Sequence, residues 1–450
     1  MKLDLRFIIP STAGDALLLD DGGRLARAAV DGNEDEAAVV AVHGFLRDAW
    51  AFHAPVLETH PRPAGVLDGE PVPTLVTTEP APGGWTPSGG LAFGPIPAGP
   101  LDLPEILTRR AAELLDELRS GAQPPPLRPR WSRPGWNARA VGWMTDALAA
   151  AGRPLLARPA PHFLRGISAV LRGRTAEGDV FLKSVFPPFH PEPAATRELA
   201  DRFPGTVPRV LAIDADEGWL LVDDVAAPWV GDLPAGEKAA GLSAGVRALV
   251  ALQRALAGDH AAFLAAGCPS RPLAEVADLL GACLGPDGVA ISGSPVSVER
   301  RVRAVAATRA AAARVARLGF PTTIVHGDFH PGNVALVDGR AVIIDWSDAA
   351  IASPVIDLDT WLAWGKPGPG ERQAAIDAWI DAWSGPTDPA AVRERLDDIL
   401  ILGAAYQVIS YEGIVRALEP ATRYTMAGGA TYYLGRLEER IPPAGSGMAL

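Results

Sequence analysis

Apolar and polar residues along the first third of the chain follow a pattern that predicts a small sheet. Leu3–Ile9, Asp15–Leu19 and Arg24–Val30 are short apolar runs, and Asp20-Asp-Gly-Gly23 between the last two is a tight-turn sequence. Val72–Val76 extends the sheet, with many prolines at its edges. Leu103–Arg119 then places its apolar residues on one helical face. We therefore predict a mixed α/β domain over residues 1–120 and assign no chemistry to it.

The pattern changes after three consecutive prolines at residues 124–126, which predict a stiff linker over 121–136. An amphipathic helix at about Asn137–Ala151 leads into a run of expected strands with one helix among them. We predict a β-rich small lobe over 137–226. Its elements are two strands within Phe163–Leu171, a strand at Val180–Phe186, a helix at Glu192–Phe203 and strands at Val207–Ile213 and Gly218–Val225.

From residue 227 to 450 the apolar period is helical, apart from two short β-branched runs, Thr322–Val325 and Arg340–Ile344, that predict buried strands. The expected fold class is therefore α+β, with a large helical lobe after the small one. Helices are expected at Glu237–Ala257, Leu273–Leu284, Val296–Leu318, Gly370–Ser384, Ala390–Ala417 and Thr422–Glu439.

Composition narrows the class of partner. The 41 basic and 53 acidic residues give a net charge of −12, which argues against nucleic acid or an anionic membrane as the main partner. The N-terminal apolar run contains Asp4 and Arg6, so it predicts neither a signal nor a transit peptide, and no run approaches a membrane span. Cys268 and Cys283 are in no metal-type spacing. We expect a cytoplasmic protein with free thiols.

The strongest chemical signal lies at the ends of the two predicted strands in the helical lobe. Asp328 and Asn333 are five residues apart, and Asp345 follows twelve residues later. Two carboxylates and an amide can orient an attacking hydroxyl and bind Mg²⁺, as phosphoryl transfer from a nucleotide requires. The rival interpretation is a polar turn, because Pro-Gly and Asn are ordinary turn residues.

A rare lysine supports the chemical interpretation. Only four of the 41 basic residues are lysines, and Lys183 lies in the middle of the strand Val180–Phe186. The third strand of a kinase small lobe carries such a lysine toward the nucleotide phosphates. Either Glu192 or Glu198 on the next helix is expected to hold it, with Glu192 preferred. We further expect Gly166 and Ser168 to form a phosphate-side turn, although they lack the GxGxxG pattern, and the backbone near Asp223–Val225 to contact adenine.

The segments His326–Asn333, Ile344–Trp346 and Pro354–Leu358, together with Lys183 and Glu192, resemble the aminoglycoside phosphotransferase and choline kinase-like family over about residues 150–440. This resemblance implies a two-lobed protein kinase-like fold and an ATP- and Mg-dependent kinase. It makes Asp328 the catalytic base, Asn333 and Asp345 metal ligands, and Lys183 the phosphate clamp. His330 is expected either to contact the nucleotide or to support the loop.

The acceptor is expected to be a small molecule with a hydroxyl group. Eleven residues between Asp345 and Asp357 leave no room for the longer segment with which protein kinases dock a peptide. From His326 onward, 9 basic residues against 17 acidic ones suit a cationic amino sugar or aminoglycoside, and equally an ordinary acidic surface. The candidate acceptor contacts are Asp348, Asp359, Trp361, Trp364, Tyr406, Gln407, Tyr411 and Glu412.

The alternative function is a nucleotide-binding, pseudokinase-like module that regulates a partner through the N-terminal domain. The oligomeric state does not follow from the sequence.

Overall fold

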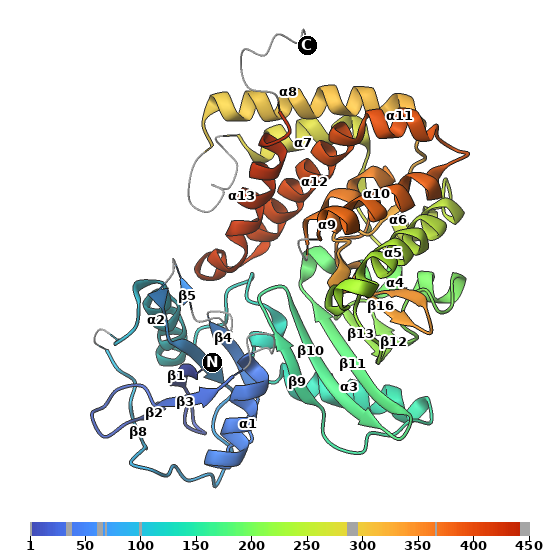
Figure 1. The fold of residues 1–450 in the computed structure, drawn as a ribbon. Coiled ribbons are helices and arrows are strands. Elements are labelled where there is room, and N and C mark those ends of the chain that lie inside the picture. Colours follow the sequence, from blue (N-terminus) through green and yellow to red (C-terminus); the bar gives the residue numbers. More distant parts are fainter. Residues whose placement is uncertain are drawn as a thin grey trace. The chain divides into compact units, whose positions relative to one another are not determined.

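The computed structural model (Figure 1) describes residues 2–32, 38–60, 66–67, 70–98, 101–285, 296–364 and 367–441. The chain divides into two compact units. The first contains residues 1–186 and 418–425, and the second contains residues 187–417 and 426–450. The short segment 418–425 therefore packs with the N-terminal part of the chain, although it follows the helices of the second unit in sequence.

The N-terminal region is built on a four-stranded sheet in the order β3-β1-β7-β4. β1 pairs antiparallel with β3 and parallel with β7, and β4 runs antiparallel to β7. Two-stranded ladders, β2 with β8 and β5 with β6, complete the strands described here. The strands are β1 (Lys2–Ile8), β2 (Ala16–Leu19), β3 (Arg27–Asp31), β4 (Val56–His60), β5 (Val66–Leu67), β6 (Glu70–Pro71), β7 (Thr74–Thr78) and β8 (Ala92–Pro95).

Two helices accompany this sheet. α2 (Glu105–Ser120) buries Leu107 and Leu115 in a core shared with the strands, as its apolar face predicts, and ends at Gly121 in the left-handed conformation. α1 (Ala38–Trp50) was not predicted. Its buried residues, Ala38, Val39, Val42 and Leu46, nevertheless lie on one helical face. Its aromatic residues pack against a strand, with the rings of Trp50 and Phe7 4.9 Å apart.

The proline-rich stretch is packed rather than extended. Arg128 and Trp131 are only 3% and 2% exposed, and Arg130–Ser132 forms a short 3-10 helix before α3 (Trp136–Ala150). The stretch 121–136, predicted as a stiff linker, thus contains a short 3-10 helix and two large buried side chains. The predicted domain boundaries themselves stay a prediction.

The first unit continues with the first three strands of the predicted small lobe, β9 (Ala160–Leu164), β10 (Ser168–Thr175) and β11 (Gly178–Val185). β10 runs antiparallel to both neighbours, and Lys183 on β11 lies opposite Val170 on β10. Gly178, the first residue of β11 after the tight turn from β10, has a φ of +126°, a conformation that favours glycine.

The second unit opens with α4 (Glu192–Arg202), which has Pro193 in its first turn, and with the hairpin of β12 (Val210–Asp214) and β13 (Trp219–Asp223). All five strands predicted for the small lobe are thus present. Helices follow, with the short strand β14 (Ser270–Arg271) among them. They are α5 (Ala235–Ala255), α6 (Ala261–Ala265), α7 (Val276–Cys283), α8 (Val298–Val315), α9 (Asp357–Ala363), α10 (Pro369–Trp383), α11 (Pro389–Glu394), α12 (Leu396–Ala417) and α13 (Tyr424–Glu438).

The core of the second unit centres on α12, which lies beside α7 and α8 (Figure 1). Among the described helices α12 alone is long and apolar enough to cross a membrane, and 89% of its apolar window is buried inside the protein. Such burial explains its composition as that of a core helix. The single helix predicted over Ala390–Ala417 is wrong. Arg395 leaves the helical conformation, and its N–H bonds to Val392, so α11 and α12 are separate.

Two short ladders carry the predicted chemistry. β15 (Thr323–Val325) pairs antiparallel with β18 (Ala350–Ala352), and β16 (Val334–Val337) pairs with β17 (Arg340–Ile343). β15 and β17 are the two strands expected from the β-branched runs, and they are almost wholly buried. The polar segments that follow them contain Asp328 and Asp345.

Candidate active site

The loop after β15 is held at its backbone by side chains from distant elements. The carboxylate of Asp357, at the start of α9, accepts hydrogen bonds from the N–H groups of His326 (3.1 Å) and Gly327 (2.9 Å). Gln253 donates to the same carboxylate at 2.8 Å. Burial raises the pKa of Asp357 to about 6, although these three donors oppose the shift.

Gly327 requires glycine for two reasons. Its φ of +81° lies in the left-handed region, and a Cβ built there would come 2.1 Å from the carbonyl oxygen of Asp348. The carbonyl of Gly327 accepts a hydrogen bond from the Gln407 side-chain amide. Both backbone polar groups of Gly327 are thus fixed immediately before Asp328.

His326 connects the two strand ends. Its Nε2 lies 2.9 Å from the carbonyl oxygen of Ile344, and its Nδ1 accepts the Asp328 N–H at 3.3 Å. The side chain is fully buried and its ring lies 4.8 Å from that of Trp346. Through these contacts His326 connects the loop after β15 to the segment that follows β17.

His330 stands beside the predicted base. Its Nε2 is 3.8 Å from a carboxylate oxygen of Asp328, and its Nδ1 accepts the N–H of Gly332 at 3.1 Å. Burial lowers the pKa of His330 to about 4, so the imidazole is neutral at physiological pH. Its ring stacks on Trp364, with centroids 4.8 Å apart and an angle of 25° between the planes.

Asn333 and Asp345 offer oxygens suited to Mg²⁺. The Asn333 amide nitrogen donates to the carbonyl of Asp328 at 3.1 Å, which commits the nitrogen and leaves the amide oxygen for a cation. Asp345 has φ of +64°, unusual for a residue other than glycine, and accepts the Ser347 hydroxyl at 2.5 Å. Described residues form no cluster of three His, Cys, Asp or Glu groups for a metal. An amide, one carboxylate and nucleotide phosphates suit Mg²⁺, which keeps few protein ligands.

Comparison with known families now adds to this geometry. The model of the phosphotransferase enzyme family matches residues 163–395. The chain belongs to this family. The match spans more than half of the sequence and includes Lys183, the loop with Asp328 and Asn333, and Asp345. It confirms the predicted family, the kinase-like α+β fold and the enzyme class, a phosphotransferase that acts on an alcohol group.

Several solved structures are similar to the chain at low sequence identity. A macrolide 2'-phosphotransferase type I is 18% identical with a TM-score of 0.44, covering 67% of this chain and 97% of the other. A choline/ethanolamine kinase family protein from Mesorhizobium loti is 17% identical with a TM-score of 0.48, covering 68% and 96%. A thermostable aminoglycoside phosphotransferase mutant, solved with ADP and hygromycin B, is 15% identical with a TM-score of 0.45, covering 68% and 99%. No curated protein matches the sequence.

The predicted nucleotide contacts of this phosphotransferase are distributed over both units. Lys183 is half-buried on β11 of the first unit, and Gly166 and Ser168 lie at the turn between β9 and β10. Glu192 is buried at the start of α4 in the second unit, while Asp223 and Val225 are partly exposed at the end of β13. Glu198, the other expected partner of Lys183, lies 3.5 Å from Arg202. Their roles stay predictions.

Several predicted acceptor contacts of the phosphotransferase are instead internal. Trp361 is fully buried and stacks on Phe329 at 4.2 Å, and Gln407 bonds to Gly327 and to the Thr360 hydroxyl. Such side chains cannot meet an acceptor, so we remove them from the acceptor set. Two further candidates are internal as well. Tyr406 is fully buried under Arg271, and Asp359 is paired with Arg436 and Arg440.

The remaining candidates differ in exposure. Trp364 is 47% exposed, and Tyr411 and Asp348 are partly exposed. Asp348 accepts the Ser410 hydroxyl at 2.5 Å. Glu412 is 2% exposed and lies 3.0 Å from Arg416, which commits its carboxylate to an ion pair. Trp364, Tyr411 and Asp348 are thus the candidates that an acceptor can reach.

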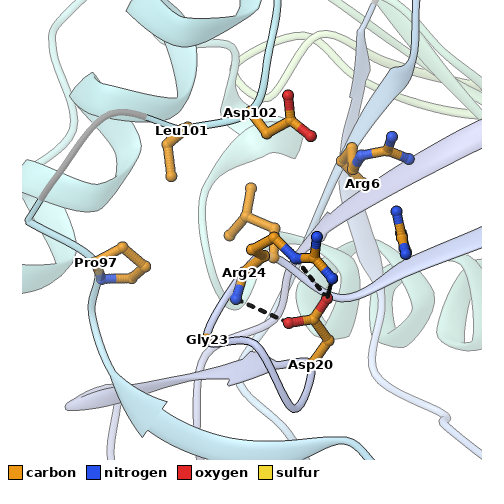
Figure 2. Close-up of a pocket in the computed structure, with 9 residues that line it drawn as sticks. Arg6, Asp20, Gly23, Arg24, Pro97, Leu101 and Asp102 are labelled. Atoms are coloured by element: carbon orange, nitrogen blue, oxygen red, sulfur yellow. Dashed lines mark hydrogen bonds and ion pairs between the residues drawn. The ribbon is translucent and has the colours of Figure 1, made fainter.

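A small cavity of about 80 Å³ lies in the first unit, among N-terminal elements. Figure 2 shows Asp20 paired with Arg24 on one side of it, and Arg6 and Asp102 on the other. Its lining contains none of the predicted site residues. Two of its arginines have carboxylate partners, since Arg6 pairs with Asp4 as Arg24 does with Asp20. We assign this cavity no chemistry.

Proposed function

We propose that this chain transfers the γ-phosphate of ATP to a hydroxyl group of an amino sugar, an aminoglycoside or a similar small metabolite. The observation that carries the proposal is that side chains from distant elements hold the backbone of the loop from His326 to Asn333 in place. Its backbone is fixed by Asp357 and Gln407, so that the Asp328 carboxylate and the Asn333 amide oxygen are presented in a fixed conformation. Preorganised polar groups are what phosphoryl transfer demands of a protein.

In this proposal Asp328 orients the acceptor hydroxyl and takes its proton as the oxygen bonds to the γ-phosphorus, while the bond from phosphorus to the ADP oxygen breaks. Because the neighbouring His330 is neutral, it forms no ion pair with the Asp328 carboxylate, which therefore stays able to accept a proton. Asn333 and Asp345 would hold Mg²⁺, which neutralises charge on the phosphate oxygens. Lys183, supported by Glu192, would bind the phosphates, with Gly166 and Ser168 beside them and Asp223–Val225 at the adenine.

The acceptor side is proposed to include Trp364, Tyr411 and Asp348. Trp364 is exposed, and its stacking on His330 ties it to a residue adjacent to Asp328. An aromatic ring and a carboxylate bind an amine-bearing sugar by stacking and charge attraction. We also propose a cytoplasmic location, where ATP is abundant.

The test is incubation of the purified protein with labelled ATP and Mg²⁺ against aminoglycosides, amino sugars, neutral sugars, choline and homoserine. Asp328→Asn should lower transfer by about a hundredfold or more, since it removes the base and changes little in shape. Asp338→Asn is the matched control, because Asp338 lies in the exposed turn between β16 and β17, and it should keep full activity.

Nucleotide binding without transfer to any acceptor would favour the regulatory alternative. Equal turnover in Asp328→Asn and the wild type would refute the assignment of the base. Lys183→Met should weaken nucleotide binding, and an unchanged affinity would show that the small-lobe assignment is wrong.

A further inference from the structure

A buried charge network lies inside the first unit. The Arg110 and Arg128 side chains are 1% and 2% exposed. Arg110 bonds to Glu58 at 2.6 Å and to Glu419 at 3.0 Å, and Arg128 bonds to Glu419 at 2.8 Å and to Glu117 at 2.7 Å. Burial opposes ionisation of Glu58, yet the charge of Arg110 and a hydrogen bond to His60 keep the pKa of Glu58 well below its usual range.

This network joins segments that are far apart in sequence. Glu58 comes from β4 and Arg110 from α2, whereas Arg128 belongs to the proline-rich stretch and Glu419 to the connection that follows α12. Glu419 is 2% exposed and starts a tight turn, in which its carbonyl accepts the N–H of Thr422 at 2.9 Å. A buried carboxylate between two guanidinium groups is strongly constrained, because moving it would leave charges without compensation.

The proline-rich stretch and the connection that follows α12 also contact the turn between β9 and β10. The Trp131 indole N–H donates to the carbonyl of Arg165 at 2.9 Å. Leu418, next to Glu419, lies so close to Gly166 that a Cβ at Gly166 would be 3.1 Å from the Leu418 side chain. Within the sheet, the N–H of Arg165 donates to the carbonyl of Ser168 at 2.9 Å, and the N–H of Phe186 donates to the carbonyl of Ile167 at 3.1 Å.

We propose that the N-terminal domain positions the nucleotide-side turn Arg165–Ser168 through Glu419, Arg128 and Trp131. The proposal rests on the function above, in which Gly166 and Ser168 meet the phosphates of ATP. The turn lacks the glycine pattern that usually shapes such a loop. In addition to its backbone bonds, the turn is held from outside the strands, by Trp131 at Arg165 and by Leu418 at Gly166. Glu419, Arg128 and Trp131 are positioning residues, since none of them needs to touch the nucleotide.

Two conservative variants test this. Trp131→Phe removes the hydrogen bond to Arg165 and keeps an aromatic ring, and Glu419→Gln removes the charge with little change of shape. Each should weaken ATP binding and raise the KM for ATP by about tenfold, the result of losing about 1.4 kcal/mol of binding free energy. The acceptor KM, and kcat at saturating ATP, should stay within about twofold of wild type.

Two control variants separate positioning from stability. Glu113→Gln also removes a carboxylate from the network, but Glu113 lies on α2, its side chain is 42% exposed, and it pairs with Arg110 rather than with Arg128. Leu114→Ala opens a cavity in the N-terminal core and should lower the Tm at least as much as the test variants. Both controls should keep the wild-type affinity for ATP. Equal ATP affinity in all four variants and the wild type would overturn the proposal.

Hydrogen exchange of the wild-type protein gives a test that needs neither a variant nor an acceptor. Since coupling between two sites is reciprocal, ATP should slow amide exchange in 128–132 and 418–425 as well as in the turn. Protection confined to the turn would refute the positioning role. If ATP does not bind to the wild-type protein at all, the proposed function fails instead, so the two failures can be told apart.

Discussion

The carboxylate of Asp357 accepts the backbone N–H of Gly327 across thirty residues of sequence, at 2.9 Å, directly before the predicted catalytic base. The Gln407 side-chain amide, eighty residues after Gly327 in the sequence, donates to the carbonyl of the same glycine. The conformation of the loop is therefore set by α9 and α12 rather than by the loop alone. Changes at Gly327 should consequently reach Asp328.

Gly327→Ala is expected to abolish most of the phosphotransfer. The added Cβ would come 2.1 Å from the Asp348 carbonyl oxygen, and the left-handed backbone would be strained as well. Because displacement of a reacting group by about 1 Å can cost about a hundredfold in rate, we expect a loss of at least that size. Steady-state kinetics with any acceptor that the panel identifies would measure it.

Gly339→Ala is the matched control for this substitution. Gly339 has a similar φ of +77°, but its Cβ would meet nothing within 4 Å. The two variants share the backbone strain and differ in the clash. Similar activity in both would mean that the clash with Asp348 is relieved at no cost to the loop.

The pKa of Asp357 gives a pH-dependent contribution to stability. Its pKa rises from 3.8, the ordinary value for an aspartate side chain, to about 6 in the fold, so between these values the folded state binds the proton more tightly than the unfolded chain. Its contribution to the free energy of unfolding is greatest below about pH 4. It decreases as the pH rises to about 6, by about 1.4 kcal/mol for each pH unit.

Asp357→Asn removes this ionisation. We therefore compare the unfolding free energies of wild type and variant by denaturant titration. The difference should favour the wild type most at pH 4, and this advantage should decrease as the pH rises to 6. Groups common to both proteins cancel in the difference. A difference that is constant from pH 4 to pH 7 would contradict a raised pKa for Asp357.

The family and the strands β15 and β17 were predicted correctly because their sequence signal is local. Asp328, Asn333 and Asp345 are recognisable because turn residues and β-branched strands fix their spacing within twenty residues. The role of Gln407 in holding the loop could not be assigned, since a buried helix of apolar residues gives no sign of which polar side chain faces a distant turn. The prediction that Trp361 contacts the acceptor was wrong for the same reason. The helical spacing of an aromatic residue does not reveal whether it lines a site or fills a core.

The N-terminal domain was the least predictable part. Its apolar runs predict β1, β2, β3 and β7, whereas β4 and β8 were not predicted. The strand order depends on pairing β1 with β7, which no local pattern specifies. The role of Glu419 is equally hidden, because its partners Arg110 and Arg128 lie 309 and 291 residues away. Long-range ion pairs of this kind leave no trace in a single sequence.

Cys268 should be inert toward thiol reagents in the folded protein. Burial raises its pKa to about 11, and its side chain is 3% exposed, so both the thiolate fraction and access to it are low at pH 8. Labelling with iodoacetamide followed by mass spectrometry should find Cys268 unmodified until denaturant unfolds the second unit. Rapid modification under native conditions would show that this part of the core opens readily.

Trp364→Ala should weaken acceptor binding without affecting ATP. Trp364 is 47% exposed and stacks on His330, which lies 3.8 Å from the Asp328 carboxylate. We therefore expect a ring-shaped acceptor to stack on the indole while its hydroxyl group reaches Asp328. Losing an aromatic contact worth about 1 kcal/mol should raise the acceptor KM by about five- to tenfold, with the ATP KM unchanged. Trp364→Phe retains a stacking surface and should recover most of the affinity. An equal loss in the phenylalanine and alanine variants would instead point to the indole N–H, and no loss in either would exclude Trp364 from the acceptor site.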